Sequence, residues 1–128
     1  MQWSVRAMGI AAGLIISGAG AVLAQHHQVT QAAHREVMLE TGRDLYRSLC
    51  ETCHGPAGDG AGGAPNLVDG QVVSQYPTTK ALAGFIQKRM PASDPRSLTS
   101  IQARQLALWI RHLNHLSDSS PVQLKLIP

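Results

Sequence analysis

Two cysteines and a histidine stand close together near the middle of the chain, at Cys50, Cys53 and His54. On a helical turn, positions i, i+3 and i+4 lie on the same face. Two thiols on that face can form thioethers with the two vinyl groups of a haem, and the imidazole can bind the iron. The pattern Cys-x-x-Cys-His therefore predicts one covalently attached haem c, with His54 as the proximal iron ligand.

The same cysteine pair has three other uses, which the sequence disfavours. A redox Cys-x-x-Cys motif would need a surrounding βαβ unit, and the flanking sequence shows no such strand. Structural zinc needs four ligands, whereas Cys50, Cys53 and His54 supply three and the chain has no further cysteine. A disulfide within the motif can form in unprocessed protein, but it would leave His54 unexplained.

The first 24 residues have the composition of a targeting segment. Arg6 precedes an uncharged, mostly apolar run from Ala7 to Leu23, and small residues follow up to Ala24. The run is shorter than the ~20 residues that a bilayer span prefers. We therefore predict that residues 1–24 are a cleaved signal peptide, with an uncleaved membrane anchor as the alternative. Either outcome exports the rest of the chain, in a bacterium to the periplasm, which is the usual compartment for haem c attachment.

The composition of the 128 residues suits one small domain with a thin core. Aromatic residues make up only 4% of the chain, so a buried porphyrin would add apolar mass that the side chains lack. The 11 Lys and Arg are scattered among 8 Asp and Glu and form no basic tract. Nucleic-acid binding is therefore not expected.

Hydrophobic periodicity predicts three main helices. After a flexible lead-in over residues 25–33, the first helix is expected from about His34 to Leu49, leading directly into Cys50. The second is expected from about Thr78 to Lys88, with Thr78 or Thr79 as its N-cap. It must end before Met90-Pro91, because the residue before a proline avoids helical geometry.

The last helix has the clearest signal. Thr99 and Gln102 form a predicted capping box. The apolar positions that follow make one stripe: Ala103, Leu106, Ala107, Ile110 and Leu113. Trp109 and Leu116 flank the stripe, and the polar face is expected to consist of Arg104, Gln105, Arg111, His112 and Asn114. The main domain is thus predicted over residues 34–116, with a C-terminal tail at 117–128.

A glycine-rich segment, Gly55 to Pro65, directly follows the cysteine motif. Glycine allows the backbone to approach a flat ligand closely and to turn with positive φ. A flexible linker would have a similar composition. The position of the segment beside the motif favours an ordered loop against the haem.

The second axial position of a haem iron decides what the protein can do. Met90 is the best candidate for the distal ligand, because its thioether sits in a loop braced by Pro91. Met38 lies within the first predicted helix, where it is expected to fill the core. His112 and His115 are one turn apart and mimic metal-ligand spacing, but they fit the polar surface of the last helix.

Five short segments, spread over about Gly42 to Leu116, resemble the class I (Met/His-ligated) monohaem cytochrome c family. They are Gly42 to Tyr46, Cys50 to Gly55, Pro65 to Leu67, Arg89 to Pro91, and Leu106 to Ile110 with Trp109. The resemblance implies an all-α fold of three main helices wrapped around one haem, with the first and last helices crossing near Gly42 and Trp109. It also implies that the Pro65 carbonyl accepts a hydrogen bond from the His54 ring.

A one-electron carrier, and not an enzyme, is the function that this ligation predicts, because Met/His iron has no open site. The expected partners are redox proteins, either a periplasmic dehydrogenase or a terminal oxidase or other respiratory complex. The chain would serve as a mobile carrier or as an electron-accepting subunit, and it would be membrane-bound only if residues 1–24 stay attached. The alternative is a five-coordinate haem protein that binds or senses a small gas.

Four basic residues bracket the predicted Met90 loop in sequence: Lys80, Lys88, Arg89 and Arg96. We hypothesise that they form a basic rim that steers acidic partners to the haem edge. Ordinary solvated surface charges are the alternative interpretation.

Overall fold

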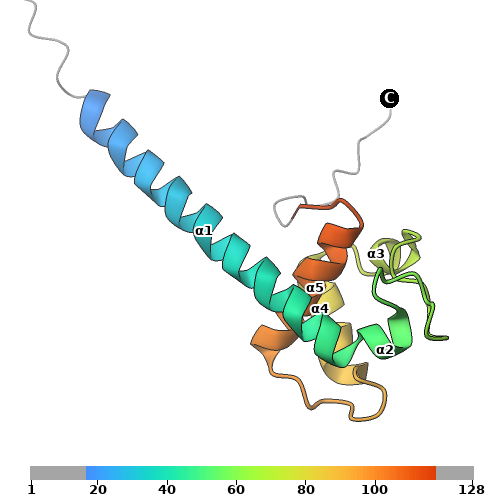
Figure 1. The fold of residues 1–128 in the computed structure, drawn as a ribbon. Coiled ribbons are helices and arrows are strands. Elements are labelled where there is room, and N and C mark those ends of the chain that lie inside the picture. Colours follow the sequence, from blue (N-terminus) through green and yellow to red (C-terminus); the bar gives the residue numbers. More distant parts are fainter. Residues whose placement is uncertain (1–16, 118–128) are drawn as a thin grey trace, which may run out of the picture. The chain divides into compact units, whose positions relative to one another are not determined.

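Residues 17–117 are described by the computed structural model, and within this range the chain forms five helices and no strand (Figure 1). The helices are α1 (Ser17–Leu49), α2 (Glu51–His54), α3 (Gln71–Gln75), α4 (Thr79–Arg89) and α5 (Ser100–Leu113). The predicted all-α fold is confirmed, and α1, α4 and α5 contain the three main helices expected from the sequence. The short helices α2 and α3 were not predicted as separate elements.

The chain divides into two compact units, Met1–Ala33 and His34–Pro128. Residues 1–16 of the predicted signal peptide and residues 118–128 of the predicted tail lie outside the described residues. In the first unit, residues 17–33 are helical throughout, so the stretch 25–33 belongs to α1 instead of forming a loose lead-in. That stretch contains no glycine or proline to interrupt a helix. No helix within residues 17–117 has the length and hydropathy needed to cross a membrane.

The core of the second unit is built mainly from α4 and α5, which pack against each other. Its buried residues are Tyr46, Leu67, Leu82, Ile86, Leu98, Ala103, Leu106, Ala107 and Ile110. Four of the five residues of the predicted α5 stripe are therefore buried, and Leu113 is half-buried. Each large side chain in such a core contributes about 1.5–3 kcal/mol through burial.

Both helices begin where their capping residues predict. At α5, the Gln102 N–H donates to Thr99 Oγ1 (3.2 Å), and the Thr99 N–H donates to Gln102 Oε1 (2.9 Å). At α4, Thr78 accepts a hydrogen bond from the Ala81 N–H (3.1 Å) and is the N-cap. These contacts satisfy amide groups that the first helical turn leaves unpaired.

Arg111 was predicted to lie on the polar face of α5, but the structure shows it buried. Its residue is 1% exposed, and its guanidinium donates to the carbonyl oxygens of Pro77 (2.8 Å) and Ser117 (3.4 Å). Position 111 follows the buried Ile110 and lies one turn after the buried Ala107, so the helix turns it inward. The long side chain thereby joins the segment before α4 to the segment after α5.

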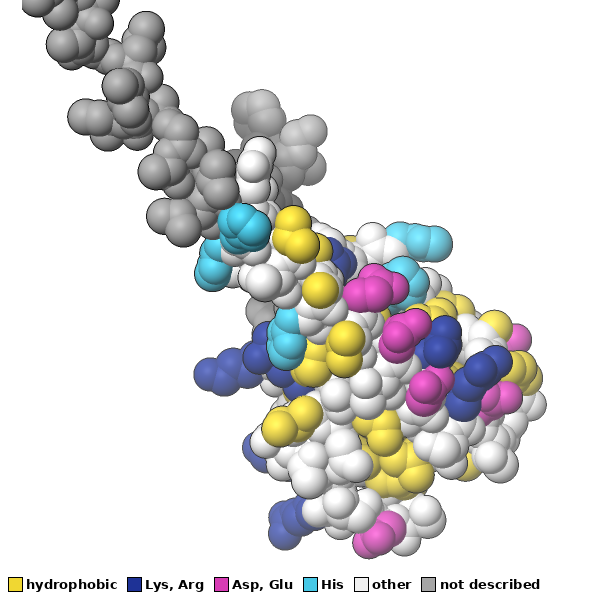
Figure 2. Space-filling model, turned by 60° about the vertical axis from the view of Figure 1, so that its left-hand side comes forward, with side chains coloured by type: hydrophobic (Ala, Val, Ile, Leu, Met, Phe, Trp, Pro, Cys, Tyr) yellow, Lys and Arg dark blue, Asp and Glu magenta, His cyan; other side chains and the backbone are white. Residues whose placement is uncertain are grey.

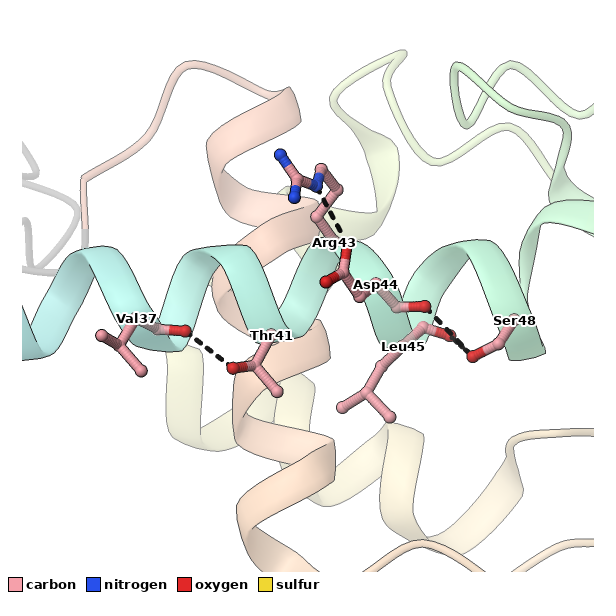
Figure 3. A network of polar contacts seen from close by, with 6 residues as sticks. All are labelled: Val37, Thr41, Arg43, Asp44, Leu45 and Ser48. Carbon is pink, nitrogen blue, oxygen red and sulfur yellow. Dashed lines mark hydrogen bonds and ion pairs between the residues drawn. The ribbon is translucent and has the colours of Figure 1, made fainter.

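The polar contacts drawn in Figure 3 are local ones, each between residues of α1 that are close in sequence. The hydroxyl of Thr41 donates to the Val37 carbonyl (2.8 Å), and the exposed pair Arg43–Asp44 is 3.1 Å apart. An exposed ion pair of this kind contributes little, about 0–1 kcal/mol. The attachment of α1 to the core therefore depends on its buried side.

At Gly42, α1 lies very close to α5, as the resemblance to the cytochrome c family implies. A Cβ at Gly42 would overlap the carbonyl oxygen of Gln105 and lie 3.2 Å from the Cβ of Trp109. Nearby, the Gln105 side-chain amide is 3.7 Å from the sulfur of Met38. Only a residue without a side chain allows the two backbones to come this close.

Gly42→Ala is expected to lower the free energy of unfolding by about 1–3 kcal/mol, because the added methyl group forces the helices apart. The matched control is Gly84→Ala in the middle of α4, where a Cβ would meet nothing within 4 Å. That change is expected to stabilise the protein by about 0.5–1 kcal/mol through helix propensity. Denaturant unfolding of both variants measures the difference, and equal effects would contradict the close crossing.

Candidate haem site

The three residues of the cysteine motif lie on one turn, formed by α2 and the residue before it. The amides of Cys53 and His54 both donate to the Cys50 carbonyl oxygen, at 3.2 and 2.9 Å. Cys50 is half-buried against the core, Cys53 is exposed and His54 is buried. Both thiols are free, so no disulfide closes the motif. The two thiols and the imidazole are thus grouped on a single turn of backbone.

The environment of Cys50 differs from that of a reactive redox thiol. Burial, with a smaller contribution from neighbouring Cys53, raises the pKa of Cys50 to about 11. Reactive cysteines of Cys-x-x-Cys oxidoreductases have lowered pKa values, because the thiolate is the nucleophile. The structure therefore gives the redox-motif interpretation of the pair no support.

His54 is oriented by a hydrogen bond to the backbone. Its Nδ1 lies 2.9 Å from the carbonyl oxygen of Pro65. A carbonyl can only accept, so Nδ1 must carry the proton and donate it. In a neutral imidazole with this tautomer, the other ring nitrogen, Nε2, has a lone pair that can bind a metal ion.

The glycine-rich segment is an ordered loop that folds back onto α2. The amides of Gly60 and Ala64 donate to the carbonyls of His54 (2.8 Å) and Cys53 (3.0 Å). Gly62 allows this approach, because a Cβ there would overlap the Thr52 carbonyl oxygen. The loop thus satisfies the exposed carbonyls at the end of α2 and carries Pro65 to His54.

Tyr46 connects α1 to the turn after His54. Its residue is 1% exposed, and its hydroxyl donates to the carbonyl oxygen of Gly55 (2.7 Å). Burial raises the pKa of Tyr46 to about 12, and Cys50, Glu51 and Asp59 add to the shift. From the sequence, Tyr46 is only the end of a segment that resembles the cytochrome c family, and this hydrogen bond was not predicted. The position of Tyr46 one helical turn before Cys50 is the signal that could have revealed it.

Met90 lies at the C-cap of α4, and its side chain packs, half-buried, against the core. Its amide donates to the Ile86 carbonyl (2.8 Å), and Pro91 prevents the helix from continuing. The structure thus places Met90 in the same compact unit as the cysteine motif. Its assignment as an iron ligand stays a prediction.

His112 in α5 and His115 just after it are exposed, unlike the buried His54. His112 is exposed and stacks on Trp109, with ring centroids 5.3 Å apart. His115 is exposed, with a positive φ of 58°, just after the end of α5. Both lie at the surface of the unit.

A small all-α domain with a Cys-x-x-Cys-His turn, and with its histidine bonded to a proline carbonyl, has the architecture of a cytochrome c. Residues 37–110 match the family model described as cytochrome c oxidase, cbb3-type, subunit III. The chain belongs to this family of class I monohaem c-type cytochromes, which confirms the family predicted from the sequence. It is therefore a haem c electron-transfer protein. No curated protein and no solved structure matches the chain.

Tyr46→Phe is expected to cost about 1–2 kcal/mol, because the buried Gly55 carbonyl loses its donor. The effect depends on pH. The folded pKa of about 12 lies above the ordinary 10.0, so the folded state holds the Tyr46 proton more tightly. That contribution is complete below pH 10 and is lost as the pH rises through 12.

The difference in unfolding free energy between wild type and Tyr46→Phe should therefore shrink from pH 10 to pH 12. Denaturant titrations across this range measure it. Tyr76→Phe, which removes the chain's other tyrosine hydroxyl, is the control. A difference that does not vary with pH would contradict the burial of the Tyr46 hydroxyl.

Proposed function

We propose that the chain carries one haem c, bound through thioethers of Cys50 and Cys53, with His54 as the proximal and Met90 as the distal iron ligand. The hydrogen bond from His54 Nδ1 to Pro65, at 2.9 Å, carries the proposal. It leaves Nε2 ready for iron on the same turn that presents both thiols. This donor set suits haem c, which needs two thiols and an imidazole from one short segment.

Partly exposed apolar residues in the second unit also support this proposal. Eight hydrophobic residues pack against the buried core while keeping part of their surface exposed: Leu45, Cys50, Val72, Tyr76, Ala83, Phe85, Met90 and Trp109. Figure 2 shows hydrophobic side chains reaching the surface between charged ones on one face. A porphyrin would cover apolar surface of this kind.

Electron transfer follows from the residues proposed as ligands. Haem c, when bound, supplies an iron that takes up and releases one electron. His54 and Met90 would together hold the iron, which would leave it no free position for a substrate. The soft sulfur of Met90 favours the reduced state, while the Pro65 bond makes His54 a stronger donor. The chain is therefore proposed to be a carrier and not a catalyst.

The setting that we propose is an exported protein in a bacterial respiratory system. Removal of residues 1–24 would leave a periplasmic carrier, and their retention would anchor the domain to the membrane. The family description points to a terminal oxidase as the partner, with the chain as an electron-transferring subunit. Accepting electrons from a periplasmic dehydrogenase is compatible with the same site.

Met90→Ala is expected to lower the reduction potential and to let CO bind the reduced protein, because one axial position opens. The matched control is Met38→Ala, which removes a half-buried methionine of α1 that contacts Gln105. It should leave both properties unchanged. A wild-type protein that already binds CO, with no change in Met90→Ala, would favour the five-coordinate gas-binding protein instead.

The basic rim (Lys80, Lys88, Arg89 and Arg96) consists of exposed residues. It belongs to the stretch 70–117, which has six Lys and Arg and a single acidic residue, Asp94. We propose that this excess of positive charge guides an acidic partner to the protein.

Oxidation of the reduced protein by ferricyanide, an anion, should therefore slow as salt is added. The variant Lys88→Glu should weaken that salt dependence. Arg47→Glu is the control, because Arg47 is an equally exposed cation in the last turn of α1. Identical salt dependence in both variants would show that the rim does not steer.

A further inference from the structure

The segment that contains Pro65 is held by a side chain from α5. The side-chain amide of Asn114 donates to the Leu67 carbonyl oxygen (2.7 Å), and the same nitrogen lies 2.9 Å from the Ile110 carbonyl. The Leu67 N–H donates to the Gly58 carbonyl (2.7 Å). Both backbone polar groups of Leu67, which is buried, are therefore bonded two residues after Pro65.

The backbone of Asn114 is held in place by hydrogen bonds. Asn114 is the C-cap of α5, and its backbone N–H donates to the carbonyls of Ile110 (3.2 Å) and Arg111 (3.1 Å). The chain then turns at His115, which has a φ of 58°, and the Leu116 N–H returns to the Arg111 carbonyl (2.9 Å). This hydrogen-bond pattern at the C-terminus of a helix is a Schellman motif. Asn114 thus extends from a rigid helix end to the loop.

Gly58, whose carbonyl accepts the hydrogen bond from the Leu67 N–H, is closely surrounded by other residues. A Cβ at Gly58 would lie 3.3 Å from Val68 Cγ1, 3.5 Å from Leu113 Cδ1 and 3.5 Å from the Tyr46 hydroxyl oxygen. Close packing leaves the turn little freedom to absorb a displacement. A shift of Leu67 would therefore displace neighbouring residues. One of these is Pro65, two residues earlier, whose carbonyl contacts the His54 ring.

We propose that Asn114 is a positioning residue for His54: by holding the Leu67 carbonyl, it sets the Pro65 carbonyl against the His54 ring and so tunes the reduction potential. This inference rests on the proposed haem ligation. A strong bond at Nδ1 makes the imidazole a better electron donor, which favours oxidised iron. Loosening it raises the reduction potential. Asn114 lies beyond residues 37–110, the segment matched by the family model.

The test compares two changes at opposite ends of α5. In Asn114→Ser, the hydroxyl can still bond back to the Ile110 carbonyl, but it is too short to reach Leu67. Thr99→Ala, the control, removes the N-cap of the same helix and leaves the Leu67 contact intact. Asn114→Leu, which removes the donor at similar volume, is the second variant.

For the haem-loaded protein, we expect Asn114→Ser to accelerate hydrogen exchange at the Leu67 amide about fivefold to tenfold, the equivalent of one lost hydrogen bond. The reduction potential should rise, and the Nδ1 resonance of His54 in the reduced protein should move. Thr99→Ala should change neither the potential nor that resonance. Asn114→Leu should shift the potential in the same direction as Asn114→Ser.

Two different failures can be told apart. A wild-type protein without covalently attached haem would overturn the proposed function and this inference with it. A haem-loaded wild type whose Asn114→Ser variant matches Thr99→Ala in potential and in the His54 resonance would overturn only the inference. Asn114 would then simply cap α5.

Discussion

The hydrogen bond between His54 and the Pro65 carbonyl is the contact on which the arrangement of the site depends. It fixes which ring nitrogen carries the proton, and so which one is available to a metal. The bond requires Pro65 to return to α2 across eleven residues of glycine-rich chain, and that return is stabilised by backbone bonds to the carbonyls of Cys53 and His54. Tyr46 of α1 and Asn114 at the end of α5 also hold this segment, through the carbonyls of Gly55 and Leu67. The helices thus position one imidazole.

The small core explains why those helices must pack so closely. Its buried side chains are mostly aliphatic, and Tyr46 is the only fully buried aromatic among residues 17–117. Gly42 lets α1 touch the backbone of α5, and Arg111 ties the ends of α4 and α5 through backbone carbonyls. These close contacts compensate for limited apolar volume. A buried haem would add to the same core.

Features with a local signal could be predicted from the sequence, whereas features set by tertiary contacts could not. The capping box at Thr99 and Gln102 and the end of α4 before Met90-Pro91 follow from neighbouring residue types. The crossing at Gly42 was implied by the resemblance to the cytochrome c family. The burial of Arg111 could not be predicted in this way, because its closer acceptor, the Pro77 carbonyl, lies 34 residues away in sequence. The hydrogen bond between Asn114 and Leu67 joins residues 47 positions apart, and no sequence pattern near either residue predicts it. The ligand role of Met90, which the Met90-Pro91 pattern suggests, is still a prediction.

The most direct test of this account is an optical spectrum of the purified wild-type protein, oxidised and then reduced, with CO added last and with covalent haem assayed after denaturation. We predict one haem that stays attached to the denatured chain, a low-spin c-type spectrum and no response to CO. A protein that carries no covalent haem would contradict the central role of Cys50, Cys53 and His54. A covalent haem that binds CO would retain those three residues and remove Met90 from the iron.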